Sequence, residues 1–109
     1  MVRIDASRIC DWSSFHDVFA EVLGFPDYYG RNLDAWIDCL SYADDPHAGM
    51  LKRAVPKGET LTLQLDNVDD LATSHPEQYQ ALLECAAFVN WRRIEAGSSP
   101  VLFLSFNRG

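Results

Sequence analysis

Two aspartates spaced four residues apart, Asp34 and Asp38, are the strongest sign of chemistry in this 109-residue chain. Side chains at that spacing lie on one face of a helix. Two like charges placed there cost an isolated helix roughly a few tenths of a kcal/mol. Asp34, in the first turn, recovers part of this cost from the helix dipole, whereas Asp38, one turn later, recovers little. A cationic partner therefore explains the pair better than the stability of the helix does.

Two adjacent tyrosines, Tyr28 and Tyr29, precede this acidic pair in a connector interrupted by Pro26 and Gly30. A tyrosine combines a rigid ring with a polar tip, which suits a protein interface, and we expect one of the two to be exposed and the other partly buried. Carboxylates accept charge-assisted hydrogen bonds from arginine or histidine. Tyrosines beside aspartates thus suit docking into a cationic cleft of another protein.

Catalysis is the competing interpretation of the acidic pair. Two carboxylates can act as acid and base, but such a pair needs unequal environments and a shielded cleft. Both aspartates are expected on the same exposed face, and no nucleophile elbow, phosphate loop or metal motif accompanies them. His16, His47 and His75 are too scattered to indicate a metal site. We therefore expect a binding protein with no enzymatic activity, cofactor or metal.

The charge of the chain is concentrated near the same residues. Sixteen acidic and nine basic residues give a formal charge of −7, and residues 26–45, with five aspartates and one arginine, carry −4 of it. Because nucleic-acid affinity depends on clustered Lys and Arg, this charge argues against direct binding to nucleic acid. It favours a basic protein as the partner.

Helical periodicity defines the elements that must position these residues. Phe15 to Leu23 repeat at helical spacing, with Asp11 or Ser13 as the cap and Gly24 as the end. A second helix follows Asn32, which can serve as its N-cap or as a contact. Its apolar stripe should face the core and leave Asp34, Ala35 and Asp38 outward; the stripe consists of Leu33, Trp36, Ile37 and Leu40.

Strands alternate with these helices, which indicates an α/β fold with a parallel sheet. Residues 1–4 and 61–65 are the first two predicted strands, and residues 100–106 are so apolar that both faces should be buried. Ser74 and Glu77 predict a capping box at the start of a long last helix. We expect Trp91 to lie in the core, Arg92 and Arg93 to offset the helix dipole, and residues 41–58 to form a long loop.

The cysteines and the N-terminus bear on the compartment. Three cysteines without a repeat spacing predict reduced, buried thiols and not a disulfide framework. Residues 1–5 lack a hydrophobic targeting segment, and no apolar run approaches the roughly 18 residues of a membrane helix. We expect a cytoplasmic protein.

The run from Phe25 to Leu40, FPDYYGRNLDAWIDCL, closely resembles the signature of the barstar family, the intracellular inhibitors of barnase-type ribonucleases. The resemblance implies one domain, residues 1–109, with a three-stranded parallel sheet packed against helices. It also implies that the second helix and its preceding loop cover the active site of a basic secreted ribonuclease or related toxin, one inhibitor monomer to one enzyme.

The resemblance further implies a role for each residue of this run. Asp38 takes the place of substrate phosphate against arginine and histidine, and Asp34 is the second acidic contact. Tyr28 packs against the catalytic histidine. Three further residues complete the docking loop, namely Tyr29, Gly30 and Asn32, and Ala35 lies beside the acidic pair. Gly30 is expected to meet a backbone requirement before any contact.

Three departures from the family pattern leave the target open. Trp36-Ile37 stands where the family more often has an aliphatic residue followed by tryptophan. The last helix reads Asn90-Trp91-Arg92-Arg93 where well-known members supply a glutamate contact, and the 41–58 loop is longer than expected. Two alternatives remain: an immunity protein of this fold directed against a different toxin, and an acidic module that mimics nucleic acid and binds a protein other than a nuclease.

Overall fold

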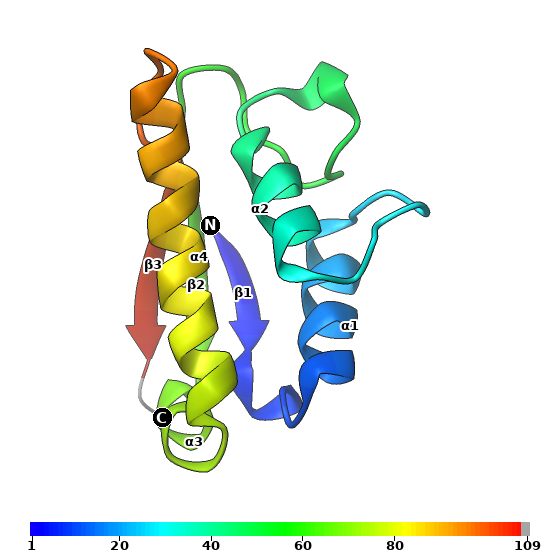
Figure 1. The fold of residues 1–109 in the computed structure, drawn as a ribbon, viewed down its shortest axis with the longest axis vertical. Coiled ribbons are helices and arrows are strands. Elements are labelled where there is room, and N and C mark those ends of the chain that lie inside the picture. The colour runs from blue at the N-terminus through cyan, green and yellow to red at the C-terminus, as the bar shows by residue number, and fades with distance from the viewer. Residues whose placement is uncertain (108–109) are drawn as a thin grey trace.

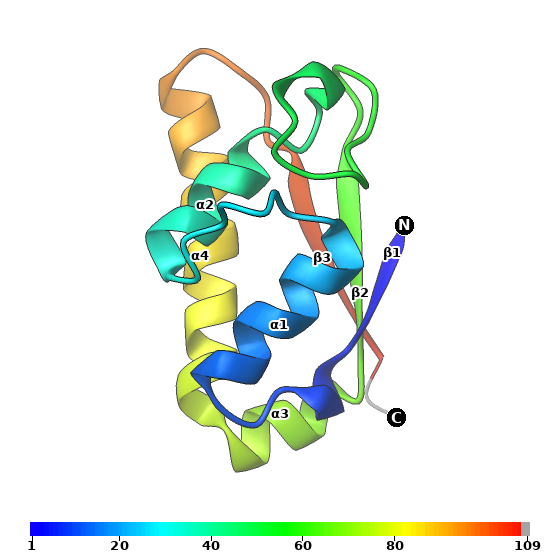
Figure 2. The ribbon, with the colours of Figure 1, turned by 90° about the vertical axis from the view of Figure 1, so that its right-hand side faces the viewer.

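A computed structural model describes residues 1–107 and contains a three-stranded parallel sheet in the order β1-β2-β3. The strands are β1 (Val2–Asp5), β2 (Leu61–Asp66) and β3 (Leu102–Asn107). The helices are α1 (Trp12–Leu23), α2 (Leu33–Ser41), α3 (Val68–Ser74) and α4 (Pro76–Glu95). Figure 1 shows α1 and α4 on either side of α2, and Figure 2, turned by 90°, shows these helices gathered on one side of the strands. The α/β fold inferred from the sequence is confirmed.

The sheet buries one face against the helices. In β2, Leu61, Leu63 and Leu65 point into the core and alternate with partly exposed polar residues. The register pairs Leu63 of β2 with Val2 of β1 and with Leu104 of β3. The apolar set of each strand therefore shares one layer, which packs against α1, α2 and α4.

The prediction for the last strand is wrong in one respect. β3 lies at the edge of the sheet, and Phe103 and Phe106 are 48% and 42% exposed. Phe103 alternates with Leu102 and Leu104 and so lies on the face that the helices leave uncovered. Phe106 is in register with Leu65 on the covered face and contacts Tyr79 of α4, but stays partly in solvent at the edge of the sheet. Apolar composition cannot distinguish this edge strand from a strand covered on both sides.

Helix boundaries follow local capping chemistry at α1. The Asp11 carboxylate accepts from the Ser14 backbone N–H at 2.7 Å, and the Ser14 hydroxyl accepts from the Asp11 N–H at 3.1 Å. Gly24 ends α1 in the left-handed region at φ +71°, and a Cβ there would lie 2.7 Å from the Lys52 Cβ. Asp11, and not Ser13, is therefore the cap.

The predicted capping box at the last helix does not form. Ser74 is the final residue of α3, whose end is marked by the His75 N–H donating to the Leu71 carbonyl at 2.9 Å. α4 begins at Pro76, which suits a first helical position because it has no N–H to satisfy. Ser74 is therefore part of α3, and His75 occupies the N-cap position of α4 in its place.

Two further expectations about side-chain burial are wrong. Trp91 is 54% exposed, because it lies on the face of α4 opposite the buried residues Leu82 and Val89. Its ring contacts that of Phe88 in a tilted arrangement, at a centroid distance of 5.4 Å. Cys10 is exposed, whereas Cys39 and Cys85 are buried as expected.

Candidate partner-binding face

α2 presents the acidic pair to solvent, as the sequence predicts. Trp36 and Leu40 are fully buried, whereas Asp34 and Asp38 are exposed on the opposite face of the helix. The Asn32 side chain caps the helix by accepting from the Ala35 N–H at 2.7 Å. Ala35 is half-buried. The structure thus brings Asp34, Ala35 and Asp38 to one surface behind a defined helix start.

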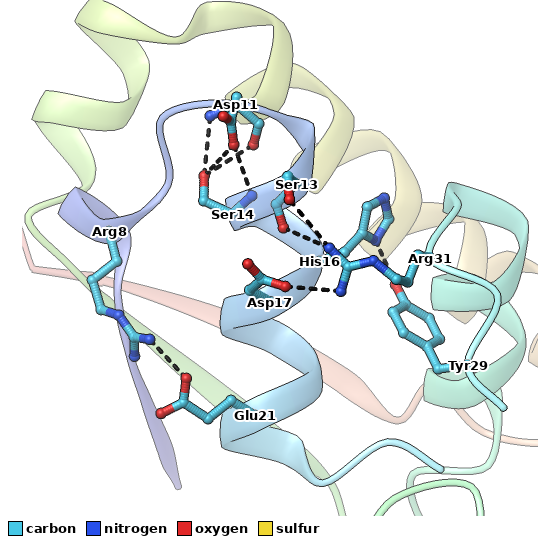
Figure 3. Close-up of polar contacts among 9 residues, drawn as sticks. All are labelled: Arg8, Asp11, Ser13, Ser14, His16, Asp17, Glu21, Tyr29 and Arg31. Carbon is cyan, nitrogen blue, oxygen red and sulfur yellow. Dashed lines mark hydrogen bonds and ion pairs between the residues drawn. The ribbon is translucent and has the colours of Figure 1, made fainter. Parts of the chain in front are cut away.

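The two tyrosines of the preceding loop have different environments, and this too is as predicted. Tyr28 is 75% exposed. Tyr29 turns inward, where its hydroxyl lies 2.6 Å from His16 Nδ1 on α1 (Figure 3). The Tyr29 ring also packs against Phe25, at a centroid distance of 4.7 Å. Burial raises the pKa of Tyr29 well above its usual range. Burial, together with the nearby Arg31 cation, lowers the pKa of His16.

Arg31, which sequence reasoning did not single out, fixes the loop from its other side. Its guanidinium lies 2.8 Å from the Asp17 carboxylate and donates to the Ser13 carbonyl at 3.1 Å, both on α1 (Figure 3). Arg31 has a left-handed backbone, with φ at 54°. A basic residue before an N-cap carries no sequence signal for this conformation.

Glycine is favoured at position 30 because a side chain there would lie too close to its neighbours. A Cβ there would lie 3.2 Å from Asn32 Nδ2 and 3.5 Å from the Ala35 Cβ. The first distance is tighter than ordinary contact, so a side chain at Gly30 would press on the capping residue of α2. The positive φ of this turn falls on Arg31 and not on the glycine.

The last helix contributes two arginines to this region. Arg92 Nη1 lies 2.8 Å from Asp38 Oδ1, and both side chains are about half exposed. Arg93 forms two hydrogen bonds to Asp44 at 2.9 and 3.0 Å and donates to the Ser41 carbonyl at 2.9 Å. Both arginines lie in the last turn of α4, where their charges suit the helix dipole as the sequence predicts, and both also reach across to α2 and the residues that follow it.

The long 41–58 loop is anchored to the rest of the fold. Leu51 is buried in the core, and the N–H groups of Lys52 and Arg53 donate to carbonyls at the end of α1. A cavity of about 810 Å³ opens between this loop and the ends of α2 and α4, with Arg92 and Arg93 among its lining residues. The cavity is lined by both cations and carboxylates, Asp44 and Asp45 among the latter, and reaches Arg92, the partner of Asp38.

Residues 1–107 contain neither a cluster of metal-ligating side chains nor a helix that could span a membrane. No group of three or more His, Cys, Asp or Glu side chains in this range is placed to hold a metal ion. None of the helices in the same range has the length and apolarity needed to cross a membrane.

Two comparisons relate this chain to known proteins. Residues 1–104 match a family model described as "Barstar (barnase inhibitor)". Over 52 residues the chain is 55% identical to a Bacillus subtilis (strain 168) protein named "Putative ribonuclease inhibitor YrdF". The aligned stretch covers 47% of this chain and 57% of that protein, so the chain spans little more than half the length of this relative.

Proposed function

Since this chain belongs to the barstar family, we propose that it inhibits a basic ribonuclease by covering the active site of that enzyme. The covering surface, here called the docking face, consists of Tyr28, Gly30, Asn32, Asp34, Ala35 and Asp38. The observation that carries the proposal is the exposure of this face: Asp34 and Asp38 are both exposed on one side of α2, and Tyr28 is exposed in the loop that leads into α2. The family description supports a ribonuclease as the target.

The acidic residues would act by imitating the substrate. A ribonuclease must hold the phosphates of RNA, and arginine, lysine and histidine do so through charge-assisted hydrogen bonds. The carboxylates of Asp38 and Asp34 offer the same groups an acceptor without a bond that can be cleaved. Inhibition would then be steric and reversible, with no covalent step.

The loop residues would divide into contact and support. Tyr28, being exposed, is placed to pack on a ring at the target's active site, such as a catalytic histidine. Tyr29 and Asn32 hold the loop and the start of α2 through the contacts to His16 and Ala35. Rigid support of this kind lowers the entropy lost on binding.

Barnase, the enzyme named in the family description, is the direct probe of this proposal. Titrating the chain into barnase with a fluorogenic RNA substrate should abolish cleavage at one equivalent. Asp38→Ala should weaken binding at least about tenfold, because a charged hydrogen bond at a desolvated contact contributes about 1.5–3 kcal/mol.

Asp70→Ala is the matched control, since it removes an equal charge from an exposed position on α3. It should bind like the wild type. Equal affinity for the wild type and Asp38→Ala would reject the docking face, and RNA cleavage by the purified chain alone would favour an enzyme.

Residence in the cytoplasm remains a prediction. It accords with an inhibitor that meets a ribonuclease before the enzyme is secreted.

A further inference from the structure

The ion pair between Asp38 and Arg92 lies on the docking face itself. Arg92 Nη1 is 2.8 Å from Asp38 Oδ1, although the residues are 54 positions apart in the sequence. The Asp38 side chain is 55% exposed and that of Arg92 41% exposed. Exposed pairs of this kind add little to stability, since water screens them and two long side chains must be ordered. Stability alone therefore does not account for a cation at this position.

The neighbouring arginine provides an internal comparison. Arg93 and Asp44 are 14% and 11% exposed and form two hydrogen bonds, and the Asp44 carboxylate also accepts from the Gly58 N–H at 3.1 Å. That pair joins α4 to the 41–58 loop and has a structural role. Arg92 makes no comparable set of contacts within residues 1–107 and stays in reach of a partner.

A cation beside Asp38 constrains what can bind there. A target arginine that bound Asp38 through both carboxylate oxygens would have to compete with Arg92 for Oδ1. A cleft that presents only cations would also repel Arg92 once water is excluded, because Coulomb interactions strengthen as the dielectric constant falls. A carboxylate opposite Arg92 would remove the repulsion and free part of Asp38 for the target's cation.

We propose that Arg92 is a specificity-determining residue of the docking face. It selects ribonucleases that present a carboxylate beside their cationic cleft and disfavours those that present cations alone. This inference rests on the proposed inhibitor function and refines its target class.

Binding of barnase to Arg92 variants tests the inference, with affinity measured by calorimetry at low salt. Arg92→Glu should bind barnase at least about tenfold more tightly than the wild type, and Arg92→Gln should fall between them. Arg8→Glu is the matched control: it makes the same change in charge and breaks a surface ion pair of similar length, Arg8–Glu21 at 2.7 Å. It should leave affinity within about twofold, apart from the general effect of net charge.

A panel of barnase variants tests the requirement for a carboxylate. Each exposed cation at the rim of the barnase cleft is replaced by Glu in turn. At least one replacement should reverse the order, so that the wild-type chain binds more tightly than Arg92→Glu. Thermal unfolding should show a Tm within a few degrees of the wild type for each Arg92 variant, which excludes misfolding as the cause.

The outcomes separate the two proposals. If the wild type inhibits barnase but Arg92→Glu binds no more tightly, or if no member of the panel reverses the order, the inference is rejected and the inhibitor function stands. If Arg92→Glu binds and the wild type does not, the role of Arg92 is supported. If neither binds barnase, both proposals fail for this class of ribonuclease.

Discussion

The hydrogen bond between Tyr29 and His16 fastens the docking loop to α1 at a distance of 2.6 Å. Tyr29 directly follows the exposed Tyr28 in the chain, so the position of this proposed contact residue depends on a partly buried polar pair. Buried polar groups are costly when they lose a partner. A change in the protonation of His16 therefore bears on both the stability of the fold and the shape of the loop.

Protonation of His16 should make stability depend on pH. Burial and the Arg31 cation lower the pKa of His16 in the folded state, so as pH falls the unfolded chain takes up this proton first. The free energy of unfolding should then decrease below about pH 6.5, with a slope of at most about 1.4 kcal/mol per pH unit from this group.

Urea unfolding between pH 7 and pH 5 measures this slope above the range where most carboxylates titrate. His16→Gln should flatten it, whatever its effect on stability at pH 7. His47→Gln, which changes an exposed histidine, should leave the slope unchanged. A slope that survives His16→Gln would contradict the assignment.

At the scale of elements, the 41–58 loop depends on the Asp44–Arg93 pair. Burial would raise the pKa of Asp44, but the Arg93 guanidinium and the Gly58 N–H outweigh it and hold that pKa below its usual value. Asp44→Ala should lower the free energy of unfolding by about 3 kcal/mol, because it leaves a mostly buried guanidinium without its partner. Asp45→Ala, at an exposed neighbouring position, should change it by less than about 0.5 kcal/mol. Urea denaturation of the two variants provides the comparison, and similar losses for both would contradict a structural role for the pair.

Local sequence determines α1 and α2, and this is why both could be predicted. Their apolar stripes have helical spacing, and their caps, Asp11 and Asn32, are formed within three residues of each helix start. The exposed aspartates of α2 follow from the same periodicity. The same short segment predicts one exposed and one partly buried tyrosine, although it does not indicate which of Tyr28 and Tyr29 turns inward.

Contacts between distant segments were not predictable in this way. Arg92 contacts Asp38 although the two residues are 54 positions apart in the sequence. The capping box predicted at the start of α4 and the dipole role predicted for the arginines at its end both consider contacts within that helix only. Trp91 was assigned to the core from its residue type, although the helical position of Trp91 faces away from Leu82 and Val89. Periodicity describes an element, whereas these contacts depend on which elements become neighbours.

At the scale of the whole molecule, the fold redistributes the charge of the chain. Residues 26–45 carry −4 in the sequence, but Arg92 and Arg93 from α4 pair with two of their five aspartates and halve this charge in space. Arg31 is paired with Asp17 of α1. Within residues 1–107, Asp34 makes no ion pair, so it supplies full negative charge to the docking face.

Association with a basic ribonuclease should therefore depend on salt and on Asp34 in particular. A net charge of −7 attracts a cationic protein over distances that ions screen, with a Debye length of about 10 Å at 0.1 M salt. Stopped-flow measurement of the association rate with barnase should show a decrease of about tenfold or more between 0.02 and 0.5 M NaCl.

Asp34→Asn should reduce the rate at low salt more than Asp70→Asn does, because both remove one charge but only Asp34 lies on the docking face. The two variants should converge at high salt. Equal rates for the two variants at low salt would show that net charge, and not its position on α2, guides the encounter.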